Sequence, residues 1–98
     1  MIEMEVKALL KAASYQAAVL VLVSKERTRR PLILQMTIGI FEAIAIERGL
    51  QGTALPRPMT HDLLMNAMQQ LGAAVDRVVV EGLEEGTYYA SIFLRTQA

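Results

Sequence analysis

The sequence predicts an α+β fold, a mostly antiparallel sheet with two inserted helices in the order β-β-β-α-α-β-β. Three observations support this prediction. Apolar side chains alternate or run unbroken at strand length near both ends of the chain, the middle of the chain has helical spacing, and strands and helices are segregated along the sequence. Segregated elements favour α+β over a parallel α/β sheet. A length of 98 residues indicates a single domain over residues 1–98.

Three strands are expected first. Residues 2–11 alternate apolar and charged side chains, which is typical of a strand packed on a core from one side. A turn at 14–16 should follow, and residues 17–23 are apolar without alternation, which favours a central strand covered on both faces. A basic loop over 24–30 then leads to a third strand over 32–38.

Two helices are predicted next. Helical spacing runs from Ile40 to Leu50, with Gly49 and Gly52 as stop signals. Thr60 suits the N-cap of a second helix that should end at Gly72, because its hydroxyl can accept a bond from an orphan amide. The apolar stripe of this second helix is Leu63, Leu64, Ala67, Met68 and Leu71.

A hairpin closes the predicted fold. Residues 74–81 and 87–95 have strand character, and the loop 82–86 between them contains two glycines. Tyr88 and Tyr89 alternate faces, so one should lie in the core. The other could pack across the strands, or stack on a base or a partner.

Composition excludes several classes of function. Without cysteine there are no disulfides, thiolate nucleophiles or zinc–cysteine sites, and a cytoplasmic location without a membrane partner is expected. Ten basic and ten acidic residues give zero net charge, which argues against tight non-specific binding to nucleic acid. The same neutrality, with 53% apolar residues, favours a homo-oligomer. Basic residues cluster only at Lys25, Arg27, Arg29 and Arg30.

The candidate catalytic residues are Glu42, His61 and Asp62. Glu42 has apolar neighbours one turn along its helix, a setting that suits proton transfer or a metal. As the single histidine of the chain, His61 excludes a two-histidine ribonuclease mechanism within one chain. Arg57, four residues before His61, could support an anion at the helix start. Each acidic residue also has a structural explanation, because negative charge stabilises the first turn of a helix.

Three motifs together resemble the bifunctional nuclease domain family. They are G-x-x-E-A-x-A-I over residues 39–46, R-P-x-T-H-D-L-L over residues 57–64 and G-T-x-Y-A over residues 86–90. The opening Met-Ile-Glu-Met-Glu-Val-Lys is also typical of that family. In the preceding strand, Leu34-Gln35-Met36 stands where the family usually has an L-P-I pattern.

The resemblance implies a nuclease that hydrolyses phosphodiester bonds of RNA, DNA or both. It implies catalysis by Glu42, His61 and Asp62, substrate binding by Arg57 and Thr60, and a divalent metal, Mg²⁺ or Mn²⁺, held by Glu42 and Asp62. Relatives typically continue past the hairpin into a segment like R-P-S-D-A-I-A-L, which this chain, ending at Ala98, is expected to lack. The alternative is a catalytically inactive, self-associating interaction module of the same fold.

Overall fold

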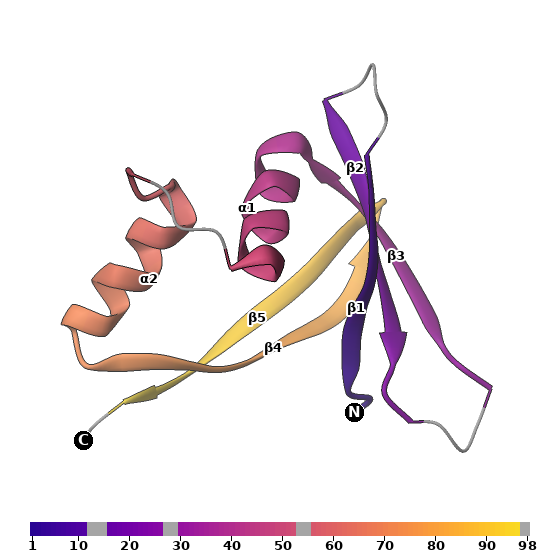
Figure 1. The fold of residues 1–98 in the computed structure, drawn as a ribbon. Helices are drawn as coiled ribbons and strands as arrows, with labels where there is room; N and C mark the ends of the chain where they lie inside the picture. The colour runs from indigo at the N-terminus through magenta and orange to yellow at the C-terminus, as the bar shows by residue number, and fades with distance from the viewer. Residues whose placement is uncertain (12–15, 27–29, 53–55, 97–98) are drawn as a thin grey trace. The chain divides into compact units, whose positions relative to one another are not determined.

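The fold follows the predicted element order in a computed structural model, which describes residues 1–11, 16–26, 30–52 and 56–96 (Figure 1). The elements are β1 (Met4–Lys11), β2 (Ala17–Ser24), β3 (Ile33–Gly39), α1 (Ile40–Gln51), α2 (Thr60–Gln70), β4 (Ala73–Glu84) and β5 (Thr87–Thr96). All strand pairs are antiparallel, and they form a sheet in the order β1-β2-β3 and a two-stranded sheet β4-β5. The predicted α+β class is therefore confirmed.

The chain divides into two compact units, Met1–Ala54 and Leu55–Ala98, which are described separately. One domain over residues 1–98 stays a prediction. The expected turn at 14–16 lies mostly outside the described residues, and so do Arg27 and Arg29 of the basic loop. Neither described helix is long and apolar enough to cross a membrane.

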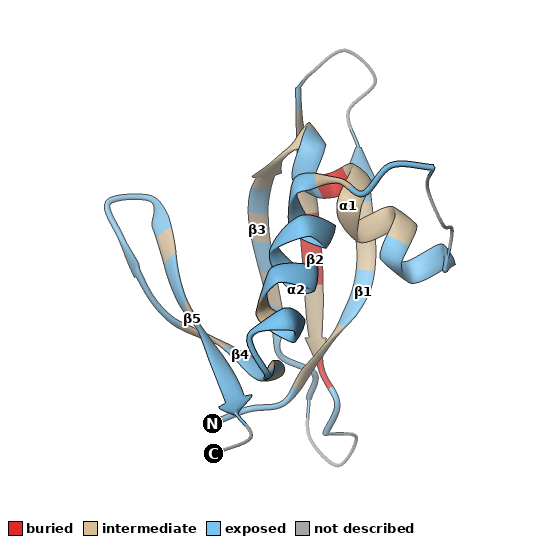
Figure 2. Cartoon of the chain, turned by 90° about the vertical axis from the view of Figure 1, so that its left-hand side faces the viewer, coloured by how far each residue is buried: buried red, intermediate tan, exposed pale blue. Residues whose placement is uncertain are grey.

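Strand β2 is the centre of the first unit, as its unbroken apolar run predicted. It pairs with β1 on one side and β3 on the other. Ala18 and Leu20 on one of its faces are buried, and so is Val21 on the other (Figure 2). A β-branched, apolar strand buried on both faces is what a central strand requires.

Strand β1 departs from the alternation predicted over residues 2–11. Its register with β2 shifts between Val6 and Ala8, which is a β-bulge. Leu9 and Lys11 therefore share a face with Val6, whereas simple alternation would have placed them with the opposite set. The prediction of one uninterrupted alternating strand is wrong at this point, because the extra residue of a bulge reverses the facing of everything after it.

Helix α1 covers the sheet face that carries Ala18 and Leu20. It contacts all three strands, and Lys11, which lies opposite Ala18, pairs with Glu47 of the helix at 2.6 Å. Ala43, at the centre of this contact, has no exposed surface. A side chain as small as alanine lets the helix approach the sheet closely. The helix ends at Gly52, which has a positive φ of 67° and donates a backbone hydrogen bond to the Arg48 carbonyl. This is a left-handed helix cap.

The second unit consists of α2 and the β4–β5 hairpin. The hairpin turn is only Glu85-Gly86, shorter than the predicted loop 82–86. Both turn residues have positive φ, 49° and 79°, as in the primed turns that match the twist of antiparallel strands. Gly72, also at φ 79°, ends α2 as predicted.

No residue among 56–96 is buried (Figure 2). Of the apolar stripe predicted for α2, only Met68 is half-buried, while Leu63 and Leu71 are 62% and 85% exposed. Tyr88 is half-buried and Tyr89 is 54% exposed, so neither tyrosine belongs to a closed core. The apolar side chains of this unit therefore do not form a buried core.

Candidate functional site

Glu42 stands in the first turn of α1 and is exposed, and its carboxylate folds back towards Gly39. A Cβ on residue 39 would lie only 2.7 Å from Glu42 Oε1. Gly39 itself has φ −72° and ψ 161°, which any residue can adopt. The glycine thus provides space for the carboxylate, and this explains the G-x-x-E spacing in physical terms.

Gly39→Ala is expected to displace the Glu42 carboxylate while keeping the fold. The clashing atom is the far end of a flexible side chain, so the free energy of unfolding should change by less than about 1 kcal/mol. Thermal unfolding and the NMR shifts of the Glu42 side chain would measure both effects. A loss above about 2 kcal/mol would contradict this interpretation, because it would mean that the backbone itself needs glycine.

Asp62 caps helix α2. Its Oδ2 accepts a hydrogen bond from the backbone N–H of Met59 at 2.9 Å, which fixes the carboxylate at the helix start. The N-cap is Met59, with extended φ and ψ of −76° and 171°, and Thr60 is the first helical residue. The prediction of Thr60 as the N-cap is therefore wrong. Asp62, three residues into the turn, performs the acidic half of a capping box.

His61 and Arg57 lie beside this cap. His61 and Thr60 are exposed on the first turn of α2, and Arg57 is exposed two residues before Met59. Four of the five residues predicted for the site thus lie within residues 57–62, at and just before the start of α2. Glu42, the fifth, belongs to the first unit.

The described residues contain no group of three histidine, aspartate or glutamate side chains close enough to hold a metal ion. Asp62 also uses one of its two oxygens in the helix cap. Mg²⁺ can bind through one or two carboxylates when waters and substrate phosphates complete its shell. A metal held by Glu42 and Asp62 would depend on such additional ligands.

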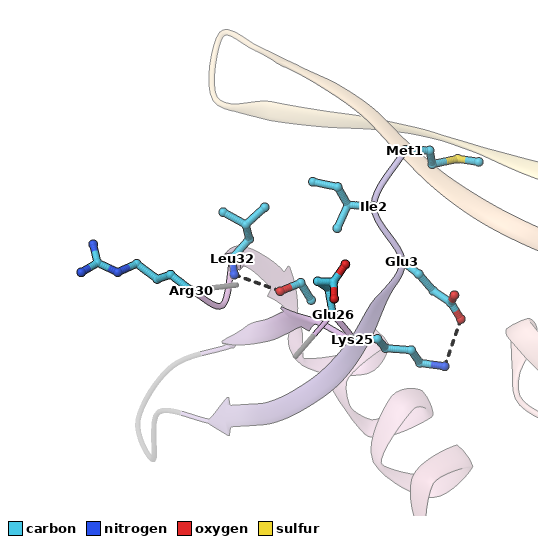
Figure 3. A pocket seen from close by; sticks show the side chains of 8 residues that line it. Met1, Ile2, Glu3, Lys25, Glu26, Arg30 and Leu32 are labelled. Atoms are coloured by element: carbon cyan, nitrogen blue, oxygen red, sulfur yellow. Dashed lines mark hydrogen bonds and ion pairs between the residues drawn. The ribbon is translucent and has the colours of Figure 1, made fainter. Parts of the chain in front are cut away.

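A hollow in the first unit lies away from Glu42. It has a volume of about 610 Å³ and is lined by Met1, Ile2, Glu3, Ser24, Lys25, Glu26, Arg30 and Leu32 (Figure 3). It adjoins the end of the sheet where Val23 pairs with Ile33, whereas Gly39 pairs with Ala17 at the opposite end. Two basic and two acidic side chains line it, and Lys25 Nζ forms an ion pair with Glu3 Oε1 at 3.1 Å. This hollow is therefore not a concentrated positive site for phosphate.

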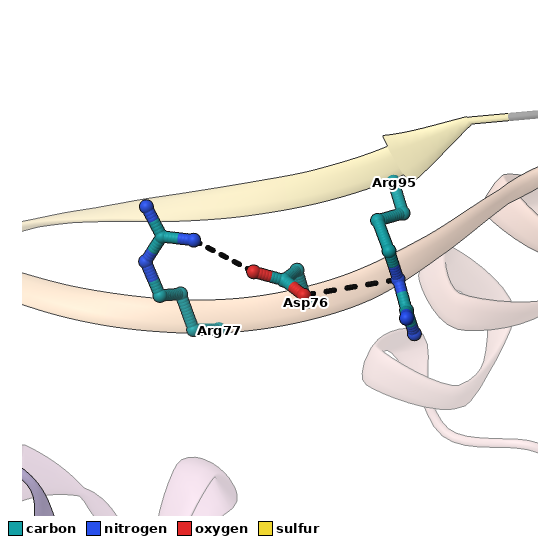
Figure 4. Close-up of polar contacts among 3 residues, drawn as sticks. All are labelled: Asp76, Arg77 and Arg95. Carbon is teal, nitrogen blue, oxygen red and sulfur yellow. Dashed lines mark hydrogen bonds and ion pairs between the residues drawn. The ribbon is translucent and has the colours of Figure 1, made fainter. Parts of the chain in front are cut away.

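A polar network on the hairpin was not anticipated from the sequence. Asp76 accepts a bond from Arg77 at 2.6 Å and lies 3.7 Å from Nε of Arg95 (Figure 4). The Arg77 guanidinium also stands 4.2 Å from the centre of the Phe93 ring. Asp76 lies in a bulge between Val75 and Arg77, and the sequence pattern alone does not locate that bulge.

Comparison with known proteins finds two relatives in Mycobacterium tuberculosis. They are uncharacterized proteins MT1877 of strain CDC 1551 / Oshkosh and Rv1829 of strain ATCC 25618 / H37Rv. Each is 42% identical to this chain over 59 residues, which cover 60% of this chain and 36% of the relative. The chain therefore matches about a third of the length of these proteins, and their names assign no activity.

The family comparison covers more of the chain. The sequence profile of the bifunctional nuclease domain matches residues 20–98, which include α1, the start of α2 and the whole hairpin. All three motifs noted in the sequence lie within that range. Because this match covers most of the chain, we conclude that the chain belongs to the bifunctional nuclease domain family.

Proposed function

We propose that the chain is a nuclease that hydrolyses phosphodiester bonds of RNA, DNA or both. The observation that carries the proposal is its membership of the bifunctional nuclease domain family over residues 20–98. The start of α2 supports it, because an imidazole, a carboxylate and a guanidinium stand there beside the amides of a helix N-terminus. The site lies in a cysteine-free chain, and we assign it to the cytoplasm.

The reaction needs one attack and two proton movements. An oxygen of water forms a bond to phosphorus, the ester P–O bond breaks, and one proton leaves the water while another reaches the departing oxygen. His61 is the group suited to proton transfer near neutral pH. Because it is the only histidine, Glu42 takes the other proton role when the two meet at the substrate.

Arg57 and Thr60 serve the substrate in this proposal. The guanidinium of Arg57 can donate two parallel bonds to a phosphate, and the Thr60 hydroxyl can donate one more. Glu42 and Asp62 would hold a divalent ion, which would supply stabilisation of the charge that develops on the phosphoryl group. The hydrogen bond from Met59 N–H engages Oδ2 of Asp62, so Oδ1 is the oxygen that would contact such an ion or the substrate.

A nuclease assay on the purified chain tests this proposal. Single-stranded RNA and DNA oligonucleotides would each be incubated with Mg²⁺, with Mn²⁺ and with a chelator. Cleavage of either substrate, lost or weakened by the chelator, is the expected result. The absence of cleavage under all conditions, with a folded protein, would contradict it.

A second candidate function is an interaction module without catalysis. The specific observation in its favour is the second unit, in which no residue among 56–96 is buried although many are large and apolar. Such a surface is characteristic of a contact with another molecule. The two functions are separable, because self-association leaves the residues at the start of α2 unused.

A further inference from the structure

The β4–β5 hairpin has one apolar face and one polar face, although its sequence does not alternate regularly. Two bulges produce this sorting, one between Val75 and Arg77 and one between Val80 and Gly82. Cross-strand partners lie on the same face of an antiparallel pair. The apolar face therefore has five rows, which are Ala73–Thr96, Val75–Leu94, Val78–Ile92, Val80–Ala90 and Leu83–Tyr88.

Charged residues lie on the opposite face. In each bulge one residue of β4 has no cross-strand partner in β5, and these two residues are Asp76 and Glu81. Asp76 is bonded to Arg77, and Glu81 accepts a short hydrogen bond from Ser91. Arg77 and Ser91 stand in the rows of the polar face, so both carboxylates point there. The apolar face is left without a charged side chain.

This uncharged face is only partly covered: Ala73, Val75, Val80 and Tyr88 are half-buried, and the other members of its rows are exposed. Val78, Leu83 and Ile92 are 58%, 56% and 53% exposed, and α2 contacts β4 without enclosing them. A two-stranded hairpin is marginal in water without a layer packed on it. The chain as a whole also exposes a large area, 8015 Å². Even two separate compact bodies of half its mass would together expose only about 6,700 Å².

The exposed area in excess of that expected for compact bodies is large enough for a protein–protein interface. The excess is roughly 1,300 Å² per chain, while a stable interface needs about 800 Å² from each partner. Zero net charge on the chain and no charge on the apolar face remove the electrostatic penalty for bringing two copies together.

The rows are also complementary to themselves. When two hairpins stack antiparallel about the middle row, Val78–Ile92 meets its own copy. The large row Leu83–Tyr88 then meets the small row Ala73–Thr96, and the small row Val80–Ala90 meets the large row Val75–Leu94. Large-on-small packing fills a core without voids, and this arrangement is a twofold contact. Stacking in the same direction would put large rows on large and small rows on small.

Edge pairing of β4 is the less favourable way to join two copies. Both bulges lie in β4, and each carries a carboxylate. Bulges and charges on an edge strand discourage pairing with another strand. We infer that two copies of this chain form a dimer by packing the apolar faces of their β4–β5 hairpins against each other across a twofold axis.

Light scattering and sedimentation of the whole chain test this inference. We expect a dimer with a dissociation constant in the micromolar range or below. Ile92→Asp, in the central row, should raise that constant at least about 30-fold, because a charge would be buried in the middle of the contact. Tyr89→Asp is the matched control, since Tyr89 lies on the same strand, is 54% exposed against 53% for Ile92, and faces the other way.

Crosslinking gives a readout that does not depend on folding of the aspartate variants. The chain has no cysteine, so Ile92→Cys introduces the only thiol. Ile92→Cys should form covalent dimers with a short bismaleimide much faster than Tyr89→Cys does. A monomer at about 100 μM, an oligomer other than a dimer, or equal crosslinking of the two cysteine variants would each overturn the inference.

Discussion

Replacing Ala43 with aspartate is expected to unfold the unit formed by α1 and the β1-β2-β3 sheet. Ala43 has no exposed surface and lies where α1 contacts the sheet. A carboxylate there would be buried without a partner and would also be too large for the space. The expected loss is at least about 4 kcal/mol, comparable to the total stability of a small domain.

Urea denaturation followed by circular dichroism measures this loss. Phe41→Asp is the matched control on the same helix, because Phe41 is 70% exposed and its replacement should cost less than about 1 kcal/mol. Ala43→Leu adds volume without charge and should fall between them, at about 1–3 kcal/mol. If Ala43→Asp and Phe41→Asp unfold at the same urea concentration, the packing of α1 on the sheet is not as described.

Loss of the imidazole in His61→Ala should reduce nuclease activity by about 10² to 10⁴, the range for removing a general acid or base. His61 is exposed on the first turn of α2, so the substitution should leave the fold intact. Asn66→Ala, at another exposed position of the same helix, controls for effects of the helix itself. Activity that is unchanged in His61→Ala would place the chemistry elsewhere.

The double variant of Glu42 and His61 tests whether the two residues act together. Glu42 and His61 lie in different units of the chain, and the proposal requires them to meet on one substrate. Groups that act as a unit give losses that do not add. We expect Glu42→Gln with His61→Ala to be little worse than the more damaging single variant. Losses that multiply would indicate that Glu42 acts independently of His61.

The sequence was most informative where a single residue determines the local backbone. Gly52 and Gly72 end the two helices because left-handed backbone favours glycine, and a sequence displays this directly. The unbroken run of β2 likewise predicted the central strand. Such features depend on one element and need no knowledge of its partners.

Predictions that depended on a partner element were less successful. The N-cap moved from Thr60 to Met59, because the Asp62 carboxylate reaches back to the Met59 amide and so starts the helix one residue earlier. Alternation failed in β1, and the bulges of β4 were not located, since the residue that becomes a bulge is selected by the neighbouring strand. The polar network of Asp76 was missed for that reason.

The two bulges of β4 also determine how the hairpin can change in length. Asp76 and Glu81 are the residues by which β4, with 12 residues, exceeds β5, with 10. Deleting either one leaves every other residue on its present face, because both neighbours keep their cross-strand partners. Deleting a paired residue such as Val78 would instead exchange the faces of everything from there to the nearest bulge. Insertions and deletions that survive in related hairpins should therefore concentrate at these two positions.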